Sequence, residues 1–349
     1  MSAHGGHRPP LQLQPLMSFP IAIIGAGGWG TALAITMARA EREVRLWAYE
    51  SYLVETILAT RENPIYLPSA RVPESVHVSN TMKEVLQGAR IVIIAVPSHV
   101  YRPVVSQMMP LLDAEMHFVS AAKGIENDTL MRMSEVVVDV LKPAFMPQVA
   151  AISGPTFAPE VARGEPTALV VASPDERLRL FLQKELSAPR FRLYTNSDLI
   201  GVEIGAAVKN IIAIAAGVAE GLGLGSNPAA ALITRGLAEI MRLVEACGGR
   251  RETLAGLAGL GDLVLTCYGS LSRNHRVGIA LGQGKNIDEI VSNMRMVAEG
   301  VKTAKATVAL ARKLEVEMPI AEKMYSVLYE GLNPRAAIDD LMDRNLREE

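Results

Sequence analysis

The sequence has 349 residues, 49% of them hydrophobic, and at roughly 150 residues per domain it predicts about two domains. This apolar content is enough for a sizeable core, which excludes a largely disordered or collagen-like chain. The 35 Lys and Arg nearly balance the 37 Asp and Glu, so the formal net charge of −2 attracts neither nucleic acid nor an anionic membrane. The two cysteines form no Cys-x-x-Cys motif and the six histidines are scattered. We therefore expect no disulfide framework, no bound metal and a reducing compartment.

The amino-terminal region carries no charge from residue 9 to residue 38, as a signal peptide or a membrane span would. Prolines interrupt its first half, and the glycines from Gly25 to Gly30 interrupt the apolar run that follows. A spanning helix would lose backbone stability at each of them, so we predict neither a targeting signal nor a membrane segment. Residues 1–16, which precede Met17, are expected to be a disordered tail or a start-site artefact.

Short apolar runs alternate with helical patterns over residues 17–196. The runs are mostly apolar on both faces and are bounded by Gly, Pro, Ser or Asn, as in a buried parallel sheet. They cover residues 21–24, 44–47, 76–79, 91–96, 118–121, 149–153 and 168–172. Helical stretches such as 31–40, 101–112 and 129–141 would form the crossovers. This alternation predicts an α/β fold with a doubly wound, Rossmann-type parallel sheet.

Strand patterns nearly disappear after Asn196. Long helical patterns rich in Ala, Leu, Ile and Glu follow at residues 199–220, 228–246, 272–281, 302–313, 321–329 and 335–344. We expect residues 197–349 to form an all-helical substrate domain.

Gly25-Ala26-Gly27-Gly28-Trp29-Gly30 is the one Gly-x-Gly-x-x-Gly motif in the sequence. It follows the first predicted strand and leads into the first predicted helix, the context in which this motif binds a dinucleotide. Gly25 would permit the tight turn, Gly27 the approach of a pyrophosphate, and Gly30 close packing of helix on strand. The helix N-terminus would offer unpaired N–H groups to the phosphates.

The choice between NAD and NADP depends on the end of the second predicted strand. Glu50 lies about 20 residues after Gly30, where an acidic residue can hold the ribose 2′-hydroxyl of NAD. Alternatively, Tyr49 stacks near the adenine and Glu50 points to solvent. No arginine follows at once to bind a 2′-phosphate, although Arg45 lies within the strand, and the sequence leaves both cofactors open.

Lys209 is the strongest candidate for proton transfer. Its neighbours from Ile204 to Ile214 are nearly all apolar or small, and Gly205 at i−4 would clear space above the ammonium group. Burial lowers the pKa of a lysine and enables it to give or take a proton near neutral pH. The alternative is a lysine that reaches solvent or pairs with Glu203.

Two further segments of the helical half carry polar groups. Asp262 lies within the glycine-rich apolar segment 256–263, where it would orient Lys209, accept a substrate hydroxyl, or simply cap a helix. The segment from Ser272 to Arg276 stands at a predicted helix start. An arginine and hydroxyls at a helix N-terminus form either a phosphate site or a solvated polar cap.

Loops that follow strands of the first domain lie where doubly wound folds bind ligands. Lys123 would place a cation beside the cofactor crevice, while Gly154 and Thr156 would offer close backbone approach and a hydroxyl. His99 also follows a strand, and we interpret it as a residue of a first helical turn rather than a proton-transfer group.

Together, these motifs resemble the bacterial NAD(P)-dependent glycerol-3-phosphate dehydrogenases from about residue 19 to residue 346. The resemblance rests on Gly-Ala-Gly-Gly-Trp-Gly-Thr-Ala-Leu-Ala (25–34), Val-Pro-Ser-His (96–99), Ala-Lys-Gly (122–124), Ser-Gly-Pro-Thr-Phe-Ala (153–158), Ala-Val-Lys-Asn (207–210), Gly-Leu-Gly-Asp-Leu-Val-Leu-Thr-Cys (259–267), Ser-Arg-Asn (272–274) and Ala-Glu-Gly (298–300). The sequence departs from the family pattern at Tyr49, where Arg or His is usual, and at Gly28, where Ser or Thr is common.

The resemblance implies hydride exchange between a nicotinamide and C2, linking dihydroxyacetone phosphate and sn-glycerol 3-phosphate, in a cytoplasmic homodimer that feeds phospholipid synthesis. It implies Lys209 as the general acid/base, with Lys123 and Asp262 beside it. The implied substrate-binding residues are Lys123, Gly154, Thr156, Lys209, Asn210, Asp262, Ser272, Arg273 and Asn274. The implied cofactor-binding residues are Gly25, Gly27, Gly28, Trp29, Gly30, Tyr49, Lys123, Ala158, Arg273, Val297 and Glu299.

Two other functions remain at this point. One is a 3-hydroxyacid or 6-phosphogluconate-type dehydrogenase of the same architecture. Segments 259–262 and 272–274 argue against it, because they favour a small phosphorylated ketone as substrate. The other is a redox sensor that binds NAD(P) without turnover. A sensor would be expected to lack a buried proton donor, so Lys209 argues against it.

Overall fold

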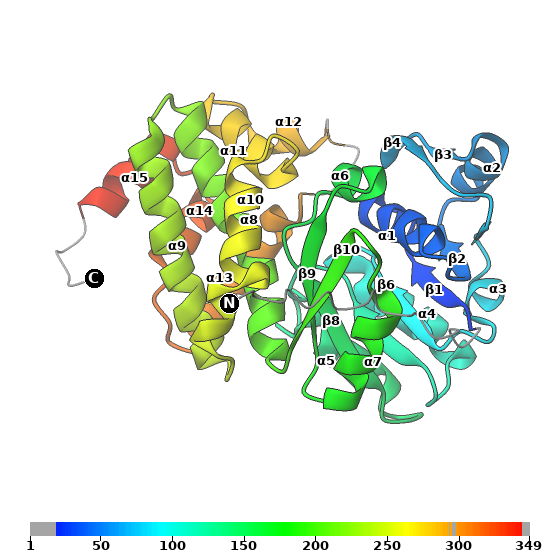
Figure 1. Ribbon diagram of the computed structural model, residues 1–349. Helices are drawn as coiled ribbons and strands as arrows, with labels where there is room; N and C mark the ends of the chain where they lie inside the picture. Colours follow the sequence, from blue (N-terminus) through cyan, green and yellow to red (C-terminus); the bar gives the residue numbers. More distant parts are fainter. Residues whose placement is uncertain (1–18, 293, 295–297, 344–349) are drawn as a thin grey trace, which may run out of the picture.

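The computed structural model describes residues 19–292, 294 and 298–343. A sheet with helices on both of its faces occupies one side of the molecule, and a bundle of helices occupies the other (Figure 1). The predicted tail, residues 1–16, and the predicted cofactor residue Val297 lie outside the described residues.

The sheet has eight strands, in the spatial order β10-β9-β8-β7-β6-β1-β2-β5. Their bounds are β1 Ile21–Ile24, β2 Val44–Trp47, β5 Val76–Ser79, β6 Ile91–Ile94, β7 His117–Ser120, β8 Gln148–Ser153, β9 Thr167–Ala172 and β10 Phe191–Asn196. Its core strands β7, β6, β1, β2 and β5 are parallel, as a doubly wound domain requires.

The predicted doubly wound α/β fold is confirmed, but one pair departs from the parallel arrangement: β9 runs antiparallel to β8. The segment between them forms only the short helix α6 (Ala158–Arg163). Arg39 donates a hydrogen bond to the Ala162 carbonyl, so α6 lies against α1 (Gly28–Arg39) and does not carry the chain across a face of the sheet. The chain therefore returns in the opposite direction.

Three strands were not predicted. Strand β10 alternates buried residues, such as Phe191 and Leu193, with exposed ones because one of its faces packs on the apolar core and the other faces solvent. Strands β3 (Glu62–Asn63) and β4 (Leu67–Arg71) form a separate hairpin with little apolar sequence.

The helices that cover the sheet fall on two faces. Residues Ile21 and Ile23 of β1 belong to a core shared with α1 and α2 (Ser51–Thr60), whereas Ala22 and Ile24 belong to a core on the opposite face. That second core includes residues of α3 (Met82–Leu86), α4 (Tyr101–Met108) and α5 (Met133–Leu141), and α7 (Glu176–Leu186) packs on the first.

Two predicted helices of this half are shorter than expected. The pattern at 101–112 ends as α4 at Met108 and continues only as a 3-10 turn over Met109–Leu111, because Pro110 has no N–H to donate to the helix. The pattern at 129–141 becomes helical only at Met133, since Arg132 instead pairs with Ile125 as an isolated bridge.

The helical half begins with α8 (Leu199–Gly221), the central helix of its core. The others that the structure describes are α9 (Ser226–Ala246), α10 (Asp262–Tyr268), α11 (Arg273–Gly282), α12 (Ile287–Ser292), α13 (Glu299–Lys313), α14 (Pro319–Tyr329) and α15 (Pro334–Met342). Helices α10 and α12 were not predicted; α10 follows a 3-10 turn at Arg251–Ala255 and a π-helical turn at Leu257–Gly261. Among the described residues, α8 alone is long and apolar enough to cross a membrane, but 89% of that stretch is buried inside the protein.

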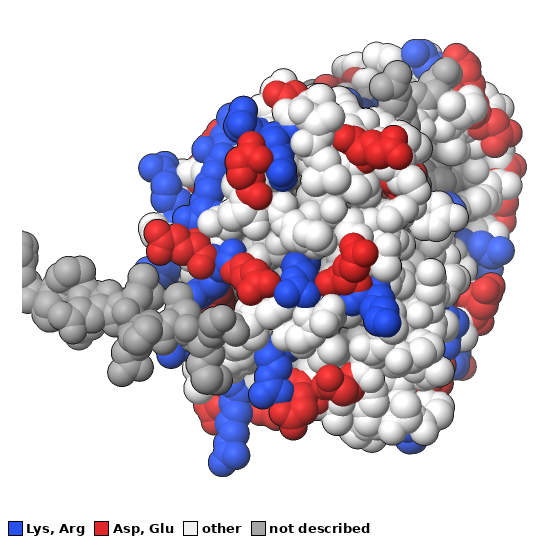
Figure 2. All heavy atoms as spheres, turned by 90° about the vertical axis from the view of Figure 1, so that its right-hand side faces the viewer, with Lys and Arg blue, Asp and Glu red and all other residues white. Residues whose placement is uncertain are grey.

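The surface of the sheet half mixes charges of both signs. Lysine and arginine alternate with aspartate and glutamate over the face shown in Figure 2, without a large area of one sign. This distribution agrees with the near-zero net charge of the sequence.

Helices α8 and α11 cross in direct backbone contact. A Cβ atom at Gly278 of α11 would lie 2.1 Å from the Ile214 carbonyl oxygen of α8, and one at Gly217 of α8 would lie 2.1 Å from the His275 carbonyl oxygen of α11. Gly221 and Gly282 repeat this fit one turn further along. The four glycines therefore set the distance at which the start of α11 lies from α8, where the candidate site is located.

We predict that Gly278→Ala lowers the free energy of unfolding by about 2–3 kcal/mol, because backbone cannot yield to the added methyl group as a flexible side chain could. Equilibrium urea unfolding measures this. A control is Gly225→Ala, where nothing lies within 4 Å of the added Cβ, and we expect a cost below about 1 kcal/mol. Equal stability of the two variants would contradict the close crossing.

Candidate active site

Two lysines from different halves of the fold meet at one carboxylate. Lys209 lies on α8, Lys123 follows β7, and Asp262 is the first residue of α10. Asp262 Oδ1 accepts a hydrogen bond from Lys209 Nζ at 2.7 Å, and its Oδ2 accepts one from Lys123 Nζ at 2.8 Å. Lys209 and Asp262 are 4% and 1% exposed. Asp262 thus orients both lysines, and the alternative of a helix cap was wrong because the capping position is Gly261.

The cluster carries two ammonium groups against one carboxylate. This excess of positive charge in a buried place suits a substrate that is anionic or that becomes so during reaction. The pKa of Lys209 is lowered to about 8, chiefly by burial; the nearby Lys123 ammonium acts in the same direction, and Asp262 opposes both effects. At neutral pH, Lys209 therefore holds a proton that it can release readily.

Thr266 completes the surroundings of Lys209, and sequence reasoning missed it. Lys209 Nζ donates to Thr266 Oγ1 at 2.5 Å, and the same hydroxyl donates to the Asp262 carbonyl oxygen at 2.6 Å. The spacing of Asp262 and Thr266 places them one turn apart on α10, which could have been recognised only if that helix had been predicted.

The space around Lys209 arises differently from the expectation. The space beside Gly205 is filled by the side chain of Leu254, whose Cδ1 would lie 2.9 Å from an added Cβ. Gly205 therefore makes room for the 3-10 turn that carries Leu254, not for the ammonium group. The alternative pairing with Glu203 is also wrong. Glu203 accepts hydrogen bonds from Arg132 Nη1 at 2.6 Å and from the Ser134 backbone N–H at 2.8 Å.

The predicted loop residues converge on Lys123. Its Nζ also donates to the Gly154 carbonyl oxygen at 3.0 Å and to Thr156 Oγ1 at 3.4 Å. Gly154 has φ +154°, and an added Cβ would lie 2.8 Å from Leu169, so both backbone conformation and space favour glycine there. His99, in contrast, is exposed in the 3-10 turn Ser98–Val100, as interpreted from the sequence.

A chain of amide hydrogen bonds joins this cluster to α11 and α13. Asn210 Nδ2 donates to the Lys123 carbonyl oxygen at 3.3 Å, and Asn210 Oδ1 accepts from Asn274 Nδ2 at 2.9 Å. Asn274 Oδ1 in turn accepts from the Gly300 N–H at 2.9 Å. The two asparagines hold four segments in register, so their amide groups are already engaged in the protein.

The start of α11 presents the predicted phosphate-binding residues. Ser272 Oγ caps the helix by accepting the His275 N–H at 3.2 Å. Burial holds the pKa of Arg273 below its usual range, and the charge of Glu299 opposes this. Glu299 Oε2 accepts a hydrogen bond from the Ser98 hydroxyl at 2.7 Å, which links α13 to the loop after β6. Ser98 was not among the predicted residues, because a lone serine after a strand gives no distinctive signal.

The glycine turn fits a dinucleotide. Gly25 has φ +115°, and a Cβ at Gly30 would lie 1.9 Å from the Gly25 carbonyl oxygen, so the turn and the helix packing both require glycine. A Cβ at Gly27 would meet nothing within 4 Å, which leaves open space over the turn. No side chain caps α1 and no acidic residue lies in its first turn, so its N–H groups face this space without a competing anion.

Of the other predicted cofactor residues, Gly28 and Ala158 lie close together. An added Cβ at Gly28 would lie 2.7 Å from the Tyr66 carbonyl oxygen and 3.7 Å from Ala158 Cβ, so the backbone as it stands leaves little room for a larger residue. Trp29 Nε1 is buried without a hydrogen-bond partner in the described structure. Tyr49 is 77% exposed. No group of three or more His, Cys, Asp or Glu that could hold a metal ion occurs among the described residues.

Known proteins match nearly the whole chain. The family model described as NAD-dependent glycerol-3-phosphate dehydrogenase N-terminus matches residues 20–179, and its C-terminus counterpart matches residues 198–339. The glycerol-3-phosphate dehydrogenase (NAD(P)+) of Koribacter versatilis is 55% identical over 326 residues, which cover 93% of this chain and 97% of that protein. That of Citrifermentans bemidjiense is 50% identical over 333 residues, covering 95% and 99%.

Solved structures agree with these matches. The crystal structure of glycerol-3-phosphate dehydrogenase from Coxiella burnetii has a TM-score of 0.89 and 44% identity, covering 94% of this chain and 99% of that one. A ketopantoate reductase of the PanE/ApbA family from Ralstonia eutropha shares only the fold, with a TM-score of 0.57 and 19% identity.

The contact between Asp262 and Lys209 predicts how the pKa of Lys209 changes when the carboxylate is removed. Asp262→Asn should lower the pKa of Lys209 below about 8, because the attraction of the carboxylate is lost while burial and Lys123 continue to act. Nitrogen NMR of lysine side chains labelled at Nζ, followed over a pH titration, measures this pKa directly. Asp288→Asn, at an exposed position on α12, is the control and should leave it unchanged. An unchanged or higher pKa in Asp262→Asn would contradict the assigned cause.

Proposed function

The chain belongs to the NAD-dependent glycerol-3-phosphate dehydrogenase family, and from this premise we propose that it interconverts sn-glycerol 3-phosphate and dihydroxyacetone phosphate. The reaction would exchange a hydride between C2 of the substrate and the nicotinamide of NAD or NADP, which supplies or accepts the hydride when bound. The observation that carries the proposal is the buried Lys209, held by Asp262 next to a second lysine.

Lys209 would act as the general acid in ketone reduction and as the general base in alcohol oxidation. Negative charge develops on the C2 oxygen as the ketone is reduced, and a buried ammonium within hydrogen-bond reach stabilises that charge and donates its proton. Asp262 would orient Lys209, and Lys123 would add a second positive charge near the reacting oxygen. The preorganised hydrogen bonds mean that little rearrangement is needed during reaction.

The substrate phosphate would bind at the start of α11. Arg273 offers a guanidinium, the helix N-terminus offers N–H groups, and the Ser272 hydroxyl can donate its own proton because its oxygen already accepts the cap hydrogen bond. Asn210 and Asn274 would keep this anchor at a fixed distance from Lys209. Gly154 and Thr156 would contribute from the loop after β8. Binding energy from the phosphate would thus orient C2.

The cofactor would bind along the glycine turn and the start of α1. The open space at Gly27 and the uncapped helix N-terminus support this position for the pyrophosphate. Gly25, Gly28, Trp29, Gly30 and Ala158 would line that end. Arg273 and Glu299, with Lys123, would lie towards the nicotinamide, and Tyr49 towards the adenosine. Val297 is proposed from the family resemblance alone.

From the resemblance, the protein would also be a cytoplasmic homodimer and would supply glycerol 3-phosphate for phospholipid synthesis. From the loss of strand patterns, the chain would divide near residues 196 and 197, which the end of β10 at Asn196 and the start of α8 at Leu199 support. The gap between the two family matches, from residue 179 to residue 198, includes this position.

The alternative dehydrogenases receive less support. Relatives at 50–55% identity are named glycerol-3-phosphate dehydrogenase, whereas the ketopantoate reductase and the D-mandelate dehydrogenase among the structural neighbours are below 20% identity. A panel assay decides between them. We expect dihydroxyacetone phosphate to cause oxidation of NADH or NADPH. A 3-ketoacid should cause no such oxidation, and 6-phosphogluconate should cause no reduction of NAD+ or NADP+. No oxidation of either cofactor with dihydroxyacetone phosphate would contradict the proposal.

Replacement of Lys209 tests the proton-transfer role. We predict that Lys209→Ala lowers kcat for dihydroxyacetone phosphate reduction by about 10²–10⁴-fold, the usual contribution of a positioned acid. The control is Lys305→Ala on the exposed face of α13, which should keep kcat within about twofold of the parent value. Near-normal turnover of Lys209→Ala at neutral pH would assign the role to another group.

The lowered pKa of Lys209 predicts opposite pH profiles for the two directions. Ketone reduction needs the ammonium form, so its kcat/KM, which reports the free enzyme, should fall about tenfold per pH unit above about pH 8. Alcohol oxidation needs the neutral amine, so its kcat/KM should fall in the same proportion below about pH 8. Steady-state rates in both directions over pH 6–10 (about two units either side of that pKa) measure this. Profiles with the same slope in both directions would contradict the assignment.

A further inference from the structure

The carboxylate of Glu50 is fixed relative to the glycine turn by a chain of hydrogen bonds. Glu50 Oε1 accepts the Tyr66 hydroxyl proton at 2.8 Å, and the Tyr66 N–H donates to Asn63 Oδ1 at 3.0 Å. Asn63 Nδ2 then donates to the Ala26 carbonyl oxygen within the turn at 2.8 Å. Glu50 is therefore partly buried and held at one oxygen, rather than extending freely into solvent. Tyr66 also packs its carbonyl against Gly28, the first residue of α1.

Glu50 has no structural task that explains this arrangement. It occupies the capping position of α2, but its side chain forms no capping hydrogen bond. Among the described residues, no lysine or arginine forms an ion pair with it, and its Oε2 has no hydrogen-bond partner. Partial burial and the carboxylate raise the pKa of Tyr66 to about 12, so Tyr66 remains a hydrogen-bond donor over the working pH range.

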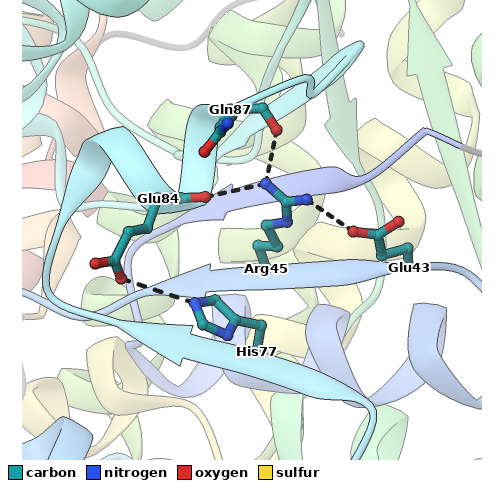
Figure 3. Close-up of a pocket in the computed structure, with 5 residues that line it drawn as sticks. All are labelled: Glu43, Arg45, His77, Glu84 and Gln87. Atoms are coloured by element: carbon teal, nitrogen blue, oxygen red, sulfur yellow. Dashed lines mark hydrogen bonds and ion pairs between the residues drawn. The ribbon is translucent and has the colours of Figure 1, made fainter.

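The nearest arginine on the same strand is directed elsewhere. Figure 3 shows Arg45 of β2 in a polar pocket near α3, where its Nη1 donates to the Glu84 carbonyl oxygen at 3.0 Å and to the Gln87 carbonyl oxygen at 2.6 Å. Its Nη2 donates to Glu43 Oε1 at 2.8 Å, so three hydrogen bonds hold it there. Lys83 is exposed on α3, whose buried residues belong to the core on the opposite face of the sheet from α2.

We propose that Glu50, positioned by Tyr66, makes the protein prefer NAD over NADP. In a doubly wound domain, the end of β2 lies beside the adenosine ribose, where Oε2 of a fixed carboxylate can accept the 2′-hydroxyl of NAD. A 2′-phosphate brings nearly two negative charges to the same place and would be repelled. This inference rests on the proposed function only where it is tested by kinetics, because cofactor binding can be measured without turnover.

The test is a pair of binding titrations of the whole protein with NADH and with NADPH, following nicotinamide fluorescence. We expect the Kd for NADPH to exceed that for NADH by about 10- to 100-fold, since a charged hydrogen bond is exchanged for a repulsion. The ratio of kcat/KM with dihydroxyacetone phosphate should change in the same direction. Equal affinities, or tighter binding of NADPH, would overturn the proposal.

Three variants assign the preference to particular atoms. Glu50→Gln removes the charge without uncapping α2, and the ratio of the two Kd values should fall to about 3 or less. The control is Glu43→Gln at the opposite end of β2, which removes the same charge and should keep the ratio of the unaltered protein. Tyr66→Phe should reduce the ratio severalfold and leave the KM for dihydroxyacetone phosphate unchanged, which separates positioning of Glu50 from general damage. A ratio that moves equally in Glu50→Gln and Glu43→Gln would contradict the role of Glu50.

The outcomes separate this inference from the proposed function. NADH binding without any turnover of dihydroxyacetone phosphate would contradict the function and leave the cofactor preference standing. Faster turnover with NADPH than with NADH would support the function and contradict the cofactor preference. Arg45→Gln, which removes the nearest arginine on the strand, would then lower the affinity for NADPH. Our proposal instead expects Arg45→Gln to leave the ratio of the two Kd values unchanged.

Discussion

A single buried carboxylate between two ammonium groups is the interaction on which the site depends. Asp262 comes from the helical half, as does Lys209, whereas Lys123 follows a strand of the sheet. Removing three charges from water is unfavourable unless they are paired and hydrogen-bonded, and here every one of them is. The pairing therefore ties the two halves together at the place where the chemistry is proposed, and the unbalanced positive charge suits an anionic substrate.

The helix crossing beneath this cluster determines its geometry. Because glycines let the backbones of α8 and α11 touch, Asn274 comes within hydrogen-bond distance of Asn210, and the latter reaches the loop that carries Lys123. Helix α8 thus serves as the core of the helical half and as the support of Lys209, the lysine proposed to transfer the proton. A rigid support matters, since a proton must move over a short and reproducible distance.

Glycines also shape the proposed cofactor site, where they allow a tight turn and leave open space. Glycine is required at Gly25 and Gly30 by conformation and close packing, while Gly27 leaves space that nothing in the described structure fills. The adjacent hairpin β3–β4, although outside the main sheet, carries Asn63 and lies beside Tyr66. Through these two residues it connects the glycine turn to Glu50, so that in the proposed cofactor preference a short polar segment would influence how the ribose is recognised.

Local patterns in the sequence were sufficient to predict most strands of the sheet, the glycine turn, the helical second half and the burial of Lys209. These features depend on periodicity, apolar runs and glycine spacing, which act between neighbours along the chain. The sequence did not reveal the antiparallel β9, helix α10 with Thr266, the pairing of Glu203 with Arg132, or the engagement of Arg45 by α3. Each of these depends on contacts between segments brought together only by folding. The residue types were visible from the start, but the partner of each charge was decided by packing, because only the folded chain determines which opposite charge or carbonyl lies within reach.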